Sequence, residues 1–164
     1  MAKQEFNAMR ISKNFTLKEF EVSQTAEKHG IDNRVPSKLV PNVKALVDEV
    51  LQPTRDKVEI PIHISSGYRC KAVNDKNLRN GASTTSQHMK GEAADIYIIP
   101  MEAKGWTLWD LAKLIVQFTD FDQLIYETRP NGSKWIHVSY TTKRANRHSM
   151  LRCKDGKHYY PLEI

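Results

Sequence analysis

The stretch Ser86-Gln-His-Met-Lys-Gly-Glu-Ala-Ala-Asp95 places an imidazole and a carboxylate seven positions apart, with a glycine and two alanines between them. Small residues let backbone segments crowd together, and histidine and aspartate are zinc-binding residue types. A third ligand of a suitable type, His137, follows in the segment Trp135-Ile-His-Val-Ser139. Together His88, Asp95 and His137 would hold Zn²⁺ through two nitrogens and one oxygen and leave a fourth position for water. This donor set is typical of a catalytic zinc site rather than a structural one.

Strand-like patterns surround two of these ligands. The run Glu92 to Ile99 ends in Ile-Tyr-Ile-Ile-Pro100 and predicts a buried strand that a proline terminates. Asp95 would therefore project from a rigid element, which suits a metal ligand. A hairpin is predicted around His137, with strands Phe121 to Glu127 and Lys134 to Tyr140 joined by the turn Arg129-Pro-Asn-Gly132.

The amino-terminal third of the chain predicts two helices. Thr16-Leu-Lys-Glu19 has the pattern of a capping box, and the helix that it begins is expected to run to about His29 and close at Gly30. Ser37 is a plausible cap for the second helix, which Pro53 would kink or stop near its end. The buried stripe of that second helix recurs at helical spacing and consists of Val40, Val43, Val47, Val50 and Leu51.

The remaining segments complete an α+β pattern. The run Val58 to Ser66 alternates like a half-buried strand, after which Gly67 is expected to supply an unusual backbone conformation. A short helical turn is expected from Cys70 to Asn77. A second capping box at Thr107-Leu-Trp-Asp110 begins a helix, and a carboxy-terminal hairpin turns at Asp155-Gly156. The inward face of that helix is predicted to be Leu108, Leu111, Ala112, Ile115 and Phe118.

The predicted fold class is therefore α+β, with amino-terminal helices packed on a mostly antiparallel sheet that carries the zinc site. A chain of 164 residues, 40% of them hydrophobic and 27% charged, is expected to form a single domain over residues 1–164 and to bury a core without disulfides. Cys70 and Cys153 lack any CxxC spacing and are interpreted as reduced thiols. No apolar run is long enough to span a bilayer or to act as a secretory signal, so the chain is expected to be cytoplasmic as synthesised.

The chain is basic, with a net charge of +6 and a pI near 9.3. Such a balance favours polyanionic partners, namely nucleic acid, acidic lipid or an anionic cell-wall polymer. No helix-turn-helix, RRM or zinc-finger spacing is present, so no nucleic-acid partner is expected. The protein is expected to be a monomer. A basic cluster near the carboxy terminus forms either a solvated face or an anion-binding surface, and it consists of Lys143, Arg144, Arg147, Arg152, Lys154 and Lys157.

Three motifs, Ser66-Gly-Tyr-Arg69, Ser86-Gln-His-x-x-Gly-x-Ala-x-Asp95 and Trp135-Ile-His-Val138, resemble the signature of the zinc D-alanyl-D-alanine carboxypeptidase family, peptidase family M15. The resemblance runs from about Ser12 to about Arg152. More narrowly, the chain is similar to the small phage and bacterial members of that family. The motifs that carry this narrower likeness are Asn14-Phe-Thr-Leu-Lys-Glu-Phe20, Ser23-Gln-Thr-Ala26, Gly30-Ile-Asp-Asn33 and Val50-Leu-Gln-Pro-Thr-Arg55.

The resemblance implies a zinc peptidase that cleaves bonds involving D-amino acids in peptidoglycan, as a D,D-carboxypeptidase or an endolysin-like endopeptidase. It implies that His88, Asp95 and His137 hold the zinc. It also implies that Arg69 faces the substrate and clamps a carboxylate or an oxyanion, although a purely structural ion pair is the alternative. The side chains expected beside the site, as substrate-binding groups, are Ser86, Gln87 and Gln123. Such an enzyme would act on the cell wall once exported or released by lysis.

One position departs from the family pattern. Catalytic members usually place an acidic residue three positions before the last zinc-binding histidine, whereas this chain has Lys134 there. Lysine is charged at neutral pH and does not act as a base unless it is strongly desolvated. The nearest substitute is Glu127, which alternation places on the same strand face as Gln123, opposite the strand of His137. Three alternatives remain for this position: Glu127 as general base, Glu127 as a solvated carboxylate of the hairpin, or a catalytically impaired zinc-bearing module that binds cell wall.

Overall fold

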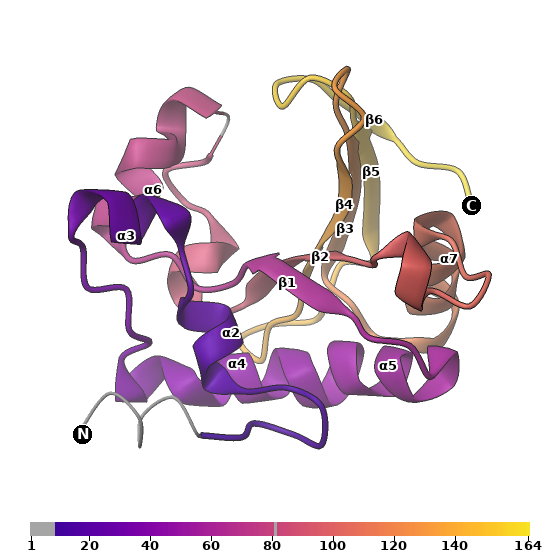
Figure 1. Cartoon of the computed structure of the whole chain (residues 1–164), viewed down its shortest axis with the longest axis horizontal. Helices are drawn as coiled ribbons and strands as arrows, with labels where there is room; N and C mark the ends of the chain where they lie inside the picture. The colour runs from indigo at the N-terminus through magenta and orange to yellow at the C-terminus, as the bar shows by residue number, and fades with distance from the viewer. Residues whose placement is uncertain (1–8, 81) are drawn as a thin grey trace.

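The fold was obtained as a computed structural model that describes residues 9–80 and 82–164. It contains a six-stranded sheet in the order β1-β2-β4-β3-β5-β6 (Figure 1). The strands are β1 (His63–Ser66), β2 (Ala93–Tyr97), β3 (Gln123–Thr128), β4 (Lys134–Ser139), β5 (Ser149–Cys153) and β6 (Tyr159–Pro161). All neighbouring strands are antiparallel except β3 and β5, which run parallel. The predicted α+β class with a mostly antiparallel sheet is confirmed.

Helices lie against both faces of this sheet. In Figure 1, α7 stands beside one face of β3, β4 and β5, while α3 and α6 stand on the other side and the α4–α5 helix crosses one end. The helices are α2 (Leu17–Glu21), α3 (Gln24–His29), α4 (Val40–Leu46), α5 (Gln52–Val58), α6 (Lys71–Asn77) and α7 (Leu108–Phe118). Shorter helical turns are η1 (Ser37–Leu39), the π-helical η2 (Val47–Leu51), η3 (Leu78–Asn80), η4 (Gln87–Lys90) and η5 (Pro100–Glu102). Among the described residues, no helix is long and apolar enough to cross a membrane.

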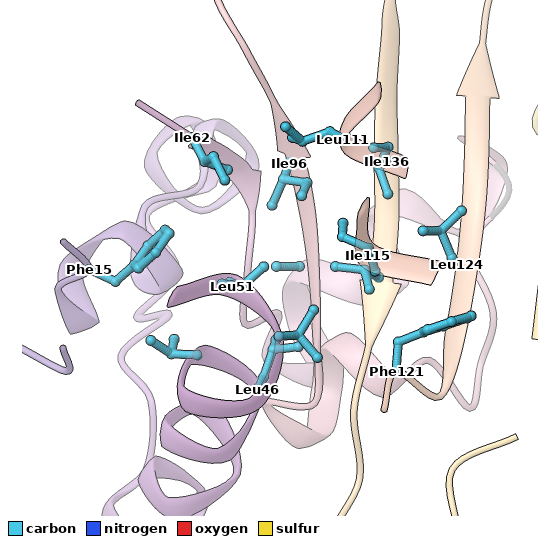
Figure 2. Packing of buried hydrophobic residues seen from close by; sticks show 14 of the residues in the cluster. Phe15, Leu46, Leu51, Ile62, Ile96, Leu111, Ile115, Phe121, Leu124 and Ile136 are labelled. Atoms are coloured by element: carbon cyan, nitrogen blue, oxygen red, sulfur yellow. The ribbon is translucent and has the colours of Figure 1, made fainter. Parts of the chain in front are cut away.

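The hydrophobic core lies on the sheet face that packs against α7 and the α4–α5 helix (Figure 2). Side chains alternate along a strand, so Ile96, Leu124 and Ile136 point into this core while their neighbours point to the opposite face. Full burial of a residue of this size stabilises the fold by about 1.5 to 3 kcal/mol. The opposite face is therefore the one that is free to carry polar groups.

The first predicted helix is in fact two, which corrects the expectation of one helix from Thr16 to His29. The capping box is present, with the Thr16 amide donating to the Glu19 carboxylate at 2.7 Å. However, Ser23 is extended (φ −150°) and its hydroxyl accepts from the amide of Ala26 at 3.1 Å, so it begins a helix of its own. The predicted end of the second of these helices at Gly30, in the left-handed conformation (φ 62°), is confirmed.

The second predicted helix differs at both ends. Ser37 does not cap it through its side chain but is the first residue of η1. Pro53 does not stop the helix, because the helix continues through α5 to Val58; that part of the prediction was wrong, and the alternative of a kink stays a prediction. Proline has no N–H to donate to the preceding turn, and the wide π-helical turn η2 lies immediately before it, where a normal α-helical hydrogen bond would be missing.

Two further expectations need correction. The strand predicted from Val58 to Ser66 begins only at His63, since Val58 still belongs to α5 and Glu59 closes that helix in the left-handed conformation (φ 54°). Phe118, in the last turn of α7, was predicted to face inward but is 51% exposed. Its ring lies under the ammonium group of Lys57. The short helix α6, the capping box of α7, the β3–β4 hairpin and the β5–β6 hairpin are confirmed.

Gly67 is required for a different reason from the one expected. Its φ angle is not positive. A Cβ atom built there would lie 2.6 Å from the Cα of Phe20, and Phe20 is fully buried. The Phe20 carbonyl also accepts from the amide of Tyr68 at 2.7 Å, so the two segments are in direct backbone contact. The glycine therefore permits α2 and the segment after β1 to approach closely.

Substitution of Gly67 by alanine is expected to lower the free energy of unfolding by about 2 to 3 kcal/mol, because neither backbone can move without opening the core. Equilibrium denaturation with urea measures this change. Gly132→Ala is the control, because nothing lies within 4 Å of its Cβ position and only its positive φ (89°) is strained, at about 1 kcal/mol. Equal losses in the two variants would contradict the close-approach explanation.

Candidate metal centre

Three separate elements bring His88, Asp95 and His137 together. Asp95 on β2 lies directly opposite His137 on β4 in the antiparallel register, so the two side chains project side by side from the polar face of the sheet. His88 comes from η4, which ends at Gly91 in the left-handed conformation (φ 69°). Gly91 turns the chain from η4 towards β2, and a Cβ atom there would meet Val43 at 3.0 Å. The glycine thus lets the end of η4 lie close to α4.

The three side chains form a group that could hold a metal ion. His88 Nε2 lies 3.2 Å from His137 Nδ1 and 3.3 Å from Asp95 Oδ1, and His137 Nδ1 lies 3.1 Å from Asp95 Oδ1. Ligands at about 2.0 Å from a tetrahedral zinc ion are separated by about 3.3 Å. The observed triangle of donor atoms therefore has nearly the dimensions of one face of a zinc coordination tetrahedron.

His88 is oriented by a single backbone group. Its Nδ1 lies 2.6 Å from the carbonyl oxygen of Gly67, and the side chain is only 2% exposed. A carbonyl can only accept, so Nδ1 carries the proton and Nε2 presents its lone pair to the other two ligands. Burial also lowers the pKa of His88 and outweighs the opposing effect of the Asp95 carboxylate. The imidazole is consequently in the neutral form that binds metals.

Asp95 is held in the ionised form. Burial alone would raise its pKa, but the electrostatic interactions and hydrogen bonds with His88 and His137 outweigh this and place the pKa well below the usual range. Its second oxygen, Oδ2, accepts from Arg69 Nη2 at 3.2 Å, and Arg69 Nε donates to Ser66 Oγ at 2.9 Å. Arg69 thus forms an ion pair with Asp95, and it also lines the cleft in front of the three ligands. Both interpretations of this residue from the sequence agree with its position.

The other residues expected near the ligands line the same cleft. Ser86 caps η4, its hydroxyl accepting from the amide of His88 at 3.2 Å. Gln87 donates through Nε2 to Asp122 Oδ2 at 3.1 Å. Gln123 lies on the cleft face of β3, and its backbone N–H donates to Ser139 Oγ at 3.1 Å. These contacts show how each residue is held, while their contact with a substrate stays a prediction.

Glu127 lies in this cleft and Lys134 does not line it. Ile125 pairs with His137, and Glu127 follows two residues later on the same strand face, about 7 Å further along β3. Glu127 is 9% exposed and accepts through Oε1 from Arg129 Nη2 at 3.0 Å. Lys134 is exposed at the start of β4. Of the two positions considered for a general base, the carboxylate therefore faces the same space as the ligands.

The cleft has a volume of about 1200 Å³ and lies between the polar sheet face and the segments that carry α3, α6 and η4. The sheet contributes Tyr97, Ile125 and Trp135 in addition to the residues already described. The facing wall includes Gln24 and Val73. A space of this size is large enough for several residues of a peptide.

An ion-pair cluster near the ligands was not recognised from the sequence. Asp122 is fully buried and bonds both Arg144, at 2.6 Å, and Arg147, at 2.8 Å. Burial would raise the pKa of Asp122, but the hydrogen bonds from these two arginines outweigh it and lower the pKa. The sequence analysis included both arginines in a general basic cluster. The signal that the sequence offered was an aspartate directly before β3, followed further along the chain by two closely spaced arginines.

Fold and site together define an α+β protein with a buried His-Asp-His trio at the floor of a peptide-sized cleft. The model of the family described as Peptidase M15 matches residues 13–139, and the chain belongs to this family. The recognition of the family from the sequence motifs is thereby confirmed. A search of curated proteins found no match.

Substitution of Arg69 by methionine is expected to weaken Zn²⁺ binding by about 10- to 100-fold, because it releases Asp95 Oδ2 and removes a group that orients the ligand. Competition with a chromophoric chelator measures this affinity. Arg152→Met removes the same charge from an exposed position that does not line the cleft, and it serves as the control. Unchanged affinity in Arg69→Met would show that the ion pair does not position Asp95.

Proposed function

We propose that this chain is a zinc-dependent peptidase that hydrolyses peptide bonds involving D-amino acids in peptidoglycan. The observation that carries the proposal is the triangle of donor atoms from His88, Asp95 and His137, with edges of 3.1 to 3.3 Å, at the floor of the cleft. Membership of the M15 family supports the peptidase class. The D-amino-acid substrate and the small phage or bacterial subgroup rest on the sequence resemblance.

In this proposal His88, Asp95 and His137 hold Zn²⁺. Bound zinc would polarise the substrate carbonyl and lower the pKa of a coordinated water to about 7. The chain supplies two neutral nitrogens and one anionic oxygen, which leave the site with a net positive charge. The burial of His88, together with its bond to the Gly67 carbonyl, keeps its lone pair directed at the ion.

Glu127 is assigned as the general base. It would accept a proton from the attacking water and deliver it to the amine of the leaving group. Its Oε1 is bonded to Arg129, which leaves Oε2 for this proton. The carboxylate projects from the central strand β3, and its bond to Arg129 limits its rotation. This assignment differs from the usual family pattern, in which the acidic residue is where Lys134 is here.

Arg69 is assigned a second role towards the substrate. Its side chain is 14% exposed and lines the cleft, so it could pair with a substrate carboxylate or a developing oxyanion while it holds Asp95. Ser86, Gln87 and Gln123 offer polar groups on the same walls for the peptide backbone. The enzyme would act as a monomer, either as a D,D-carboxypeptidase or as an endopeptidase, on wall reached by export or cell lysis.

One observation favours a second function. Lys134 occupies the usual position of the general base and is exposed outside the cleft, and Glu127 is already paired with Arg129. A protein that retains zinc and the cleft but turns over no substrate would bind cell wall instead. The two functions share the metal site and differ in whether Glu127 moves a proton.

Substitution of His88 by alanine is expected to abolish both stoichiometric zinc binding and the release of peptide or amino acid from purified peptidoglycan fragments. Removal of one of three protein ligands leaves too few donors to retain the ion. Elemental analysis and chromatography of the products measure the two effects, and treatment of the unmodified protein with a chelator should have the same result. Hydrolysis that survives both treatments would rule out the metallopeptidase.

Substitution of Glu127 by glutamine is expected to lower kcat by about 100-fold or more, since general-base catalysis contributes on this scale. Zinc content and substrate affinity should change little, because Glu127 is not a ligand. Lys134→Gln is the matched control and should retain nearly full activity. Unchanged turnover in Glu127→Gln would contradict its role as general base, whereas an unmodified protein that binds zinc and cell wall but turns over no substrate would favour the wall-binding module.

A further inference from the structure

Two arginines share one buried carboxylate at the end of the cleft. Asp122 is fully buried, whereas the side chains of Arg144 and Arg147 are 46% and 50% exposed. Each arginine donates hydrogen bonds to the Asp122 carboxylate from two of its side-chain nitrogens, and both arginines line the cleft. One negative charge therefore neutralises only one of the two guanidinium groups. The remaining positive charge faces the space in which the substrate is proposed to bind.

The guanidinium groups retain unused donors. Asp122 bonds Nη1 and Nη2 of Arg144 and Nε and Nη2 of Arg147. Arg144 Nε and Arg147 Nη1 have no hydrogen-bond partner among the described residues. A guanidinium group carries five N–H donors in a planar fork, a geometry that suits a carboxylate. The pair can therefore bind a second anion without releasing Asp122.

The segment that carries these arginines is held in place before any ligand arrives. The amide of Arg147 donates to Asp122 Oδ1 at 3.0 Å, and the amide of Ser149 donates to the carbonyl of Asp122 at 2.9 Å. Asn146 closes the same segment by accepting from the amide of Thr141 at 3.0 Å. Side chains that are already ordered lose less entropy when they bind, which favours affinity and selectivity.

The arginine pair and Glu127 lie on opposite sides of the metal ligands along β3. Asp122 precedes β3, and Ile125, three residues later, lies opposite His137. The rise of about 3.4 Å per residue places Asp122 about 10 Å along the strand from the level of the ligands. An extended peptide has the same rise, so a group two or three residues from the cleaved bond would reach the arginines.

The charges of the cleft as a whole favour an anionic substrate. Its described walls contain five basic side chains and two acidic ones. Both acids are already paired, Asp95 with Arg69 and Glu127 with Arg129. Neither acid therefore offers a free charge to a cationic substrate, and an acidic peptide would meet a positive field along most of its length.

We propose that Arg144 and Arg147, held on Asp122, form a subsite for a carboxylate of the peptide substrate, two or three residues from the cleaved bond. This inference rests on the proposed peptidase function and adds to it an acidic substrate class. Both arginines lie outside residues 13–139, the part of the chain that matches the family. The anion-binding side chains of the subsite thus come from a portion of this chain that the family match does not describe, whereas Asp122, which holds them, lies within the match.

Binding rather than turnover tests this subsite. The probes are acetylated pentapeptides ending in D-Ala-D-Ala, in which one residue is Glu or Gln at each remaining position in turn. They are titrated calorimetrically into the zinc-loaded, full-length Glu127→Gln protein, in which the expected loss of turnover limits product formation during the titration. At one position the Glu peptide is expected to bind about tenfold more tightly than its Gln counterpart, as a charge-assisted pair provides. Equal affinities at every position would overturn the subsite.

Substitutions of the two arginines test whether they cause the tighter binding of the Glu peptide. Arg147→Gln, which leaves Asp122 bonded to Arg144 and Gln87, should reduce the Glu-to-Gln ratio to near one, whereas the matched control Arg152→Gln should retain it. A ratio unchanged in both Arg147→Gln and Arg144→Gln would overturn the assignment. If Arg147→Gln fails to fold, Arg147→Lys decides instead: a smaller ratio supports the subsite and an unchanged one overturns it. Hydrolysis by the unmodified protein is measured separately, and its absence would overturn the peptidase proposal and not the Glu preference.

Discussion

The hydrogen bond between His88 Nδ1 and the carbonyl of Gly67 is the contact on which the geometry of the site depends. It determines which nitrogen of His88 faces the other ligands, and it joins η4 to the segment that follows β1. That segment approaches the Phe20 backbone so closely that no side chain fits at position 67. A core contact of α2 and the orientation of a metal ligand are therefore linked through a single glycine.

One face of the sheet packs into the hydrophobic core, and the other face carries the polar side chains of the cleft. Ile96 and Ile136 pack into the core, while Asp95 and His137, the alternate residues on the same strands, point into the cleft. The register between β2 and β4 places those two ligands directly opposite each other. A slip of one residue would bury the ligands and expose the isoleucines, so hydrophobic packing also enforces the geometry of the metal site.

Arginine side chains occur on both sides of the three candidate metal ligands, and each arginine of the cleft is tied to an acid. Arg69 holds Asp95, Arg129 holds Glu127, and two arginines share Asp122. Such pairs compensate the burial of these carboxylates, because an unpaired carboxylate in a partly buried cleft would be costly. Only at Asp122 do the cations outnumber the acid, which is why that end of the cleft is the one suited to an additional anion.

The sequence by itself determined the three candidate ligand residues, the family, the α+β class and most of the strands, because these depend on residue type and on local periodicity. It did not determine where helices divide or continue: the local cap at Ser23 divides one predicted helix, and another continues past Pro53 after a π-helical turn. Nor did it reveal the Asp122 cluster, in which the aspartate is more than twenty residues from either arginine. Only the folded chain brings such residues together, since the parallel pairing of β5 with β3 returns the segment after β4 to the mouth of the cleft.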